Sequence, residues 1–198
     1  MLRQNRDTNN IRLERCKIAF QFTLMVVASI ICGICISRML SDTFISTATN
    51  KICQHFFTVK VPRAFFEYFV DYLKISAFDI ALITLILIFS FSFINYVISD
   101  LILVFAGIRL GFFARLIATS GITFADKVAF YIFKPITMAM LFAFSLLMAL
   151  HSLEIRRFSS NGRLIKNRKK LYSMLICSIT FIGLILISNG LYCLCIYF

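Results

Sequence analysis

The order of apolar and polar positions divides the chain into long hydrophobic segments separated by short polar or basic ones. Each apolar segment is long enough to cross a hydrocarbon core about 30 Å thick, which takes roughly 17–25 helical residues. A helix satisfies its backbone hydrogen bonds within the segment, as a membrane interior requires. The pattern therefore predicts an all-α fold, a polytopic integral membrane bundle of about five transmembrane helices.

The predicted organisation covers the whole chain. In order it comprises a cytoplasmic basic tail (1–17), a first span (18–40), an outer segment with an interfacial amphipathic helix (41–74), spans two to four (75–155), a basic cytoplasmic loop (156–170) and a fifth span (171–198). A cleaved signal peptide is the alternative for the first span. Its apolar run is too long for one, and the nearest small-x-small site, Ser46 and Ala48, lies well downstream.

The segment before the second span combines charges and aromatic rings at helical spacing. Glu67, Asp71 and Lys74 recur at i, i+4 and i+7, which places them on one helical face with aromatic residues opposite. This spacing predicts a helix at the membrane interface, and a solvated loop is the alternative. The aromatic residues taken as candidates for binding an outer partner are Phe65, Phe66, Phe69 and Tyr72.

Three breaks, at Asp100, at Ser120-Gly121 and before Pro135, define the middle spans. Asp100 separates a second span, 75–99, from a third, 101–119. Pro135 is expected to start the fourth span, because proline is tolerated in the first turn of a helix and removes a hydrogen bond farther in. Residues 122–133 then form a separate short outer helix. The alternative is one long helix from residue 124 with a proline kink.

Charge gives the expected orientation. The chain is 60% hydrophobic and 15% charged, with a net charge of +12, and its basic residues are clustered. With the N-terminus inside, the tail and the loop 156–170 place twelve Lys and Arg on the inner side against five outside, which satisfies the positive-inside rule. These clusters favour anionic lipid headgroups as partners. Nucleic acid is not expected, because no aromatic platform accompanies the charges.

Small residues form a stripe along the third span. Gly107, Gly111, Ala114 and Ala118 are spaced by four, three and four residues, so that another helix backbone can approach closely. Packing within the chain is the favoured interpretation, and a homo-oligomer is the alternative.

Charged residues also occur within the predicted spans. Asp79 and Arg115 lie at similar predicted depths, so an ion pair between them is expected, whereas Arg109 has no acid at its depth. A charge in the membrane interior is costly and should face protein or water. A structural tie between helices is favoured over a polar path for an ion or substrate.

No residue pattern indicates catalysis, a metal site or a cofactor. Cys32 and Cys35 form a Cys-x-x-Cys without a second pair or a nearby His, and are expected to be buried apolar residues. Cys53 with His55 and His151 with Glu154 lack the further partners that a nucleophile or metal site needs.

Several short motifs resemble the stage II sporulation protein M family. They are Phe65-Phe66-x-x-Phe69, Val104-Phe105-Ala106-Gly107-Ile108-x-Leu110-Gly111-Phe112, the Thr119-Ser120-Gly121-Ile122 break, Lys134-Pro135 and the basic loop before the last span. The chain departs from that family by placing Arg109 and Arg115 in the third span.

The resemblance implies a non-enzymatic scaffold in the bacterial cytoplasmic membrane. Members of that family anchor peptidoglycan hydrolases, a lytic transglycosylase and an amidase-type partner, at the septal membrane during engulfment in sporulation. Cell-wall hydrolases or other membrane proteins are therefore the expected partners. A subunit of a membrane transporter or permease is the alternative that the intramembrane charges favour.

Overall fold

The computed structural model describes residues 2–40, 43–44, 46–47, 65–90, 95–159 and 165–197. In this part of the chain every long element is an α-helix and no strand occurs. The helices are α1 (Leu2–Met39), α3 (Phe65–Phe89), α4 (Asn95–Thr119), α5 (Phe124–Ser159) and α6 (Ile165–Tyr197). The predicted all-α fold is confirmed.

Five helices in the described part are long and apolar enough to cross a membrane. The stretches that meet this criterion are Leu13–Met39, Tyr68–Phe89, Asn95–Thr119, Phe124–Ser152 and Tyr172–Ile196. The chain is therefore a multi-pass membrane protein by the length and composition of its helices.

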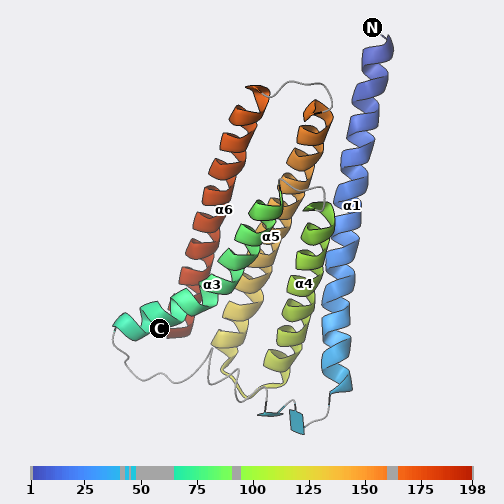
Figure 1. Cartoon of the computed structure of the whole chain (residues 1–198). Coiled ribbons are helices and arrows are strands. Elements are labelled where there is room, and N and C mark those ends of the chain that lie inside the picture. Colours follow the sequence, from blue (N-terminus) through green and yellow to red (C-terminus); the bar gives the residue numbers. More distant parts are fainter. Residues whose placement is uncertain are drawn as a thin grey trace.

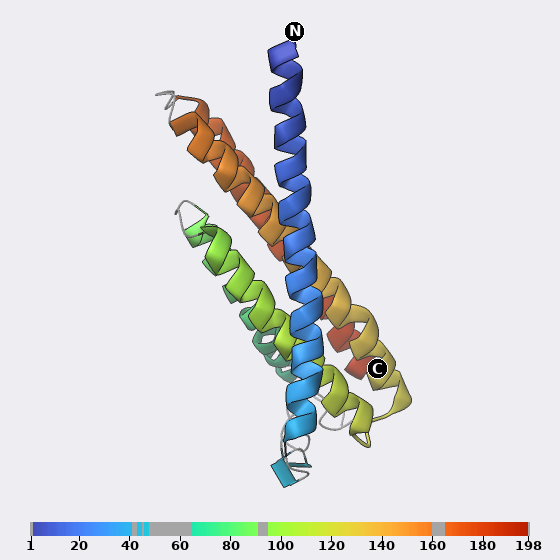
Figure 2. The same cartoon turned by 90° about the vertical axis from the view of Figure 1, so that its right-hand side faces the viewer.

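Figures 1 and 2 show the helices as a bundle in which successive neighbours run in opposite directions. α5 lies beside α6, while α3 packs on α6, α4 and α5. α1 packs chiefly on α4 and crosses the bundle obliquely, and its first turns project beyond the other helices. The start of α1, the end of α5 and the start of α6 lie at one end, which we call the N-terminal end. The end of α6 and the link between α4 and α5 lie at the other, which we call the C-terminal end.

Glycines allow α1 and α4 to approach closely. A Cβ added to Gly107 would collide with the Ser29 side chain, and one added to Gly111 with the backbone of Ile30. On the other side of the contact, a Cβ on Gly33 would collide with the carbonyl of Ile108. Small residues permit such backbone contact in lipid, where apolar burial alone gives helices no preference for each other.

The predicted stripe is thus confirmed for its glycines as a packing surface within the chain. It is wrong for Ala118, which is exposed, and Ala114 packs against the apolar cluster that contains Ile117 and Phe130.

The predicted boundary between the second and third spans is wrong. α3 ends at Phe89, and Ser90 turns the chain with its N–H and hydroxyl both donating to the carbonyl of Leu87, at 3.1 and 2.6 Å. Asp100 therefore lies in the second turn of α4 instead of separating two helices. Apolar residues on both sides of Ser90 hid this turn from a hydropathy pattern.

The predicted helix start at Pro135 is also wrong, and the alternative of one long helix from residue 124 holds. α5 continues through Pro135, so 124–133 are its first turns rather than a separate outer helix. Thr123 caps the start, since its hydroxyl donates to the Asp126 carboxylate and accepts a hydrogen bond from the Asp126 N–H at 3.4 Å. Threonine followed three residues later by an acid is a helix-start signal, and it outweighs the proline.

The flanking segments are more helical than expected. Residues 2–17 continue into the first span as one helix, and α3 runs unbroken across the predicted border between 74 and 75. Figure 1 shows the first turns of α3 lying across the C-terminal end of the bundle before the helix rises along it. α5 and α6 extend into the basic loop 156–170. Most of 41–64, and the side chains of Glu67 and Asp71, lie outside the described residues.

The buried core has two apolar clusters. The larger one, toward the N-terminal end, contains fully buried Ile83, Leu103, Phe144 and Met174 among others. The smaller one, toward the C-terminal end, contains the following residues: Ile75, Ile117, Ala129, Phe130, Tyr192, Cys193 and Ile196. Because each helix from α3 to α6 contributes to both clusters, the residues between them meet near the middle of the bundle.

Candidate functional site

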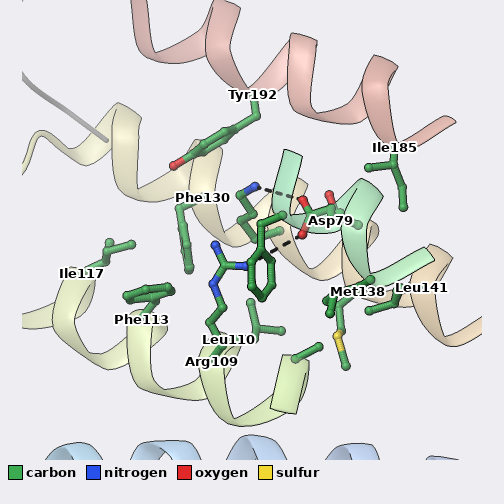
Figure 3. Close-up of a pocket in the computed structure, with 15 residues that line it drawn as sticks. Asp79, Arg109, Leu110, Phe113, Ile117, Phe130, Met138, Leu141, Ile185 and Tyr192 are labelled. Carbon is green, nitrogen blue, oxygen red and sulfur yellow. Dashed lines mark ion pairs between the residues drawn. The ribbon is translucent and has the colours of Figure 1, made fainter. Parts of the chain in front are cut away.

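A polar cluster occupies the level between the two apolar clusters. It consists of Asp79 from α3, Arg109 from α4, Lys134 from α5 and Asn189 from α6, and we call it the buried charge cluster. Each of these residues lies between core residues of its own helix; Asp79, for example, lies one turn from Ile75 and one turn from Ile83. Figure 3 shows Asp79 and Arg109 pointing toward one another across the space between their helices.

Asp79 is the centre of the cluster. Its Oδ1 lies 4.0 Å from Nη1 of Arg109, and its Oδ2 lies 3.9 Å from Nζ of Lys134. Oδ2 also accepts a hydrogen bond from Nδ2 of Asn189 at 3.0 Å. One carboxylate therefore faces two cations and an amide from three other helices.

Lys134 and Asn189 complete a chain of hydrogen bonds. Nζ of Lys134 donates to Oδ1 of Asn189 at 3.0 Å, so Asn189 bridges the ammonium to the carboxylate. The same ammonium lies 4.9 Å from the ring centre of Tyr192, within cation–π range. One turn farther along α5, the hydroxyls of Thr137 and Ser188 are hydrogen-bonded at 3.3 Å, which adds a second polar contact between α5 and α6.

Arg109 is held mainly by aromatic faces. Its guanidinium carbon lies 3.8 Å from the ring centre of Phe78 and 5.5 Å from that of Phe113. Stacking of this kind suits a weakly hydrated planar cation. Its side chain is 28% exposed, against 16% for Asp79 and 14% for Lys134.

A cavity of about 60 Å³ lies beside the cluster, between α3, α4, α5 and α6. Asp79, Arg109, Lys134 and Thr137 give its wall polar groups. The other lining residues are apolar or aromatic: Phe78, Leu82, Ala106, Leu110, Phe113, Ile117, Phe130, Met138, Leu141, Ile185 and Tyr192. Figure 3 shows the rings of Phe113, Phe130 and Tyr192 on one side of this space and Met138, Leu141 and Ile185 on the other.

The predicted Asp79–Arg115 pair is wrong, and Asp79 pairs with Arg109 and Lys134 instead. The error came from the span boundary: a second span starting at residue 75 puts Asp79 near the membrane surface. The apolar stretch actually starts at Tyr68, which places Asp79 about eleven residues, or roughly 16 Å of helix, into the span. Arg115 lies nearer the C-terminal end of α4, where its Nη1 is buried without a hydrogen-bond partner among the described residues.

Two members of the cluster, Lys134 and Asn189, were not predicted. A span that starts at Pro135 puts Lys134 at the end of a short outer helix, and so predicts a depth nearer the membrane surface than the structure shows. A signal was present in both cases, because Lys134 interrupts a long apolar run and Asn189 is the only amide in 171–198. Polar residues in such positions point into a bundle.

The predicted outer aromatic residues divide into two groups. Phe66 and Phe69 are 72% and 43% exposed, whereas the hydroxyl of Tyr72 donates to the carbonyl of Leu186 in α6 at 3.2 Å. Tyr72 thus helps to dock α3 onto α6. The side chain of Phe65 lies outside the described residues.

The remaining candidates stay dispersed. Cys32 and Cys35 are free and exposed on α1, contrary to the expectation that they are buried. Cys53, His55 and the side chain of Glu154 lie outside the described residues. Within the described ranges, no group of three or more His, Cys, Asp or Glu side chains comes together as a metal site would require.

Comparison with family models gives no match, and comparisons with curated proteins and with solved structures give no significant match.

Proposed function

We propose that this chain is a non-enzymatic integral membrane scaffold, of the kind that the stage II sporulation protein M family provides. In this proposal it recruits partner proteins, such as peptidoglycan hydrolases, at a septal membrane during sporulation. The observation that carries the proposal is the mutual engagement of charges inside the bundle: Asp79 joins α3 to cations or an amide of three other helices. Such ties favour one fixed arrangement of the helices, which a docking platform needs.

The core on the N-terminal side of the cluster supports a scaffold over a conduit. Ile83, Leu103 and Phe144 are fully buried there and belong to one apolar cluster. A polar solute would have to pass these three side chains, and desolvating it against apolar groups is costly.

The start of α3 offers the surface for a partner. Phe66 and Phe69 are exposed at the C-terminal end of the bundle, while the hydroxyls of Tyr68 and Tyr72 bond to backbone carbonyls of α6. The aromatic pair is therefore presented on a helix that is anchored at its neighbouring turns. Exposed aromatic residues on a fixed support are typical anchors of protein interfaces.

Site-specific photo-crosslinking in bacterial membranes tests the scaffold. A photoreactive phenylalanine at position 66 should give adducts with a protein that has peptidoglycan hydrolase activity. The same amino acid at Phe105, an exposed apolar position in the middle of α4, is the matched control and should give lipid adducts only. Equal protein adducts at both positions, or lipid adducts alone at position 66, would contradict the proposal.

A subunit of a transporter or permease is the second candidate, and the cavity beside Arg109 and Lys134 favours it. Two cations facing one carboxylate give this cavity a positive excess that suits an anion. Purified chain in proteoliposomes would then carry an anion flux that Arg109→Gln abolishes. Absence of flux in vesicles that retain folded protein would remove this candidate.

A further inference from the structure

The buried charge cluster has one more positive than negative charge. Asp79 is the carboxylate within ion-pair distance of both Arg109 and Lys134. In a membrane interior, an excess charge raises the free energy of the folded state unless a counter-charge or water compensates it. The cluster is therefore one negative charge short of balance.

Among the described residues, Arg109 is the cation of the cluster for which no hydrogen bond is formed. Its contact with Asp79 is 4.0 Å long, beyond the 2.7–3.2 Å or so of a hydrogen bond, and its other contacts are to the rings of Phe78 and Phe113. A guanidinium has five N–H donors in a planar fork that matches a carboxylate or phosphate. Lys134, in contrast, already donates to Asn189.

The cavity provides room for an acceptor at this place. Its volume of about 60 Å³ exceeds the roughly 10–15 Å³ that one water needs on this measure, so a group of several atoms fits. Arg109 and Lys134 line it together with rings and aliphatic side chains such as Phe113, Leu110 and Phe130. Water alone would find few polar partners on such a wall, whereas an amphiphile matches both kinds of surface.

We propose that this cavity binds an oxyanion of single negative charge, a carboxylate or phosphate group, carried on an apolar tail. The oxyanion lies between Arg109 and Lys134 and accepts hydrogen bonds from the guanidinium fork. The tail packs against the apolar wall that Leu110, Phe113 and Phe130 contribute. An anionic membrane lipid has this chemistry, and the same cations would also recognise a free oxyanion such as inorganic phosphate. The inference holds independently of the scaffold proposal.

Thermal unfolding of the full chain in a neutral detergent tests the site. Dioctanoyl phosphatidylglycerol should raise Tm in a saturable way, by about 5–10 °C at roughly a hundredfold excess over its Kd. Dioctanoyl phosphatidylcholine, which has no net charge, should give no saturable shift. Inorganic phosphate, compared with chloride at equal ionic strength, tests for a free oxyanion.

Two variants assign the shift to the cavity. Arg109→Gln should abolish it while leaving the cluster electrically neutral and hence folded. Lys127→Gln removes a positive charge from the first turn of α5, the helix that carries Lys134, at a position outside the cavity, and should keep the full shift. Arg109→Lys keeps the charge without the planar fork, and should weaken the apparent affinity about tenfold.

Ala106→Leu distinguishes the sources of the anion. Ala106 lines the cavity, so a larger side chain there should block an amphiphile and spare a free oxyanion. A phosphatidylglycerol shift that this variant removes identifies a lipid, and a phosphate shift that survives it identifies a free anion. The proposal is overturned if neither ligand raises Tm, or if Arg109→Gln keeps the same shift as the parent.

Discussion

Asp79 carries the negative charge of the buried charge cluster. It offers two oxygens to two cations and an amide, from three helices other than its own. Its removal would leave Arg109 and Lys134 as neighbouring positive charges without a carboxylate. The two cations are not equivalent in this respect, because removing Arg109 alone leaves the cluster neutral.

A double-mutant cycle should reveal this asymmetry. Asp79→Asn should lower the free energy of unfolding by up to about 3–5 kcal/mol, the cost of an unpaired buried charge. Arg109→Gln alone should cost less, and the double variant should recover part of the loss with a coupling of about 1–3 kcal/mol. Reversible unfolding in mixed micelles measures all four proteins.

Arg115→Gln is the matched control for that cycle, since Arg115 lies on the same helix outside the cavity. Its effect should add to that of Asp79→Asn without coupling. Coupling of Asp79 to Arg115 but not to Arg109 would mean that the pairing described above is incorrect.

At the scale of residues, the sequence predicted that Asp79 and Arg109 are charged residues within the spans, but not that they form an ion pair. Charge within an apolar run is visible in a sequence, whereas depth depends on where the helix begins. An error of about two turns at the start of α3 moved Asp79 from the level of Arg109 to that of Arg115. The depth of Lys134 was predicted wrongly for the same reason, because the fourth span was expected to start at Pro135 and not at Phe124.

Among the elements, α1 depends most on a single interface, because it packs chiefly on α4. Gly33, Gly107 and Gly111 bring the two backbones together there. In α6, by contrast, a Cβ on Gly183 would meet nothing within 4 Å. The same substitution should therefore have opposite effects at these glycines.

Gly33→Ala and Gly111→Ala should each lower Tm in detergent, because the added methyl group forces the two helices apart. Gly183→Ala should leave Tm unchanged or raise it, since alanine favours a helix over glycine by about 1 kcal/mol. Thermal unfolding in detergent compares the Tm of the three variants with that of the parent. Equal stability of Gly33→Ala and Gly183→Ala would show that α1 does not approach α4 so closely.

At the scale of elements, the helix boundaries were harder to predict than the helices themselves. Hydropathy located the spans of the described residues, but Ser90, Ser92 and Asn95 are interspersed with apolar residues and lower the hydropathy too little to mark the turn at Ser90. At Thr123 the signal was present in the cap with Asp126, and Pro135 concealed it. At the start of α5, local capping chemistry is therefore a better guide than the position of proline.

At the scale of the whole molecule, the number of spans and their alternation were predictable, because they depend on segment length alone. Gly121 lies between α4 and α5, and Cys195 lies near the end of α6, so both belong to the C-terminal end of the bundle (Figure 1). They must therefore face the same side of the membrane, whichever way the bundle is inserted. Cys16, near the start of the first span, belongs to the opposite end. The positive-inside rule predicts that the N-terminal end faces the cytoplasm.

Single-cysteine labelling in intact bacterial cells tests both statements on a cysteine-free background. A membrane-impermeant maleimide should label Gly121→Cys and a protein that retains only Cys195 from outside. A protein that retains only Cys16 should react only after permeabilisation, because the basic residues of 1–17 and 156–170 predict that this end is cytoplasmic. If positions 121 and 195 react from opposite sides, the helix count or the path of the chain is wrong. If both react only after permeabilisation while Cys16 reacts in intact cells, the fold stands and the charge-based orientation is reversed.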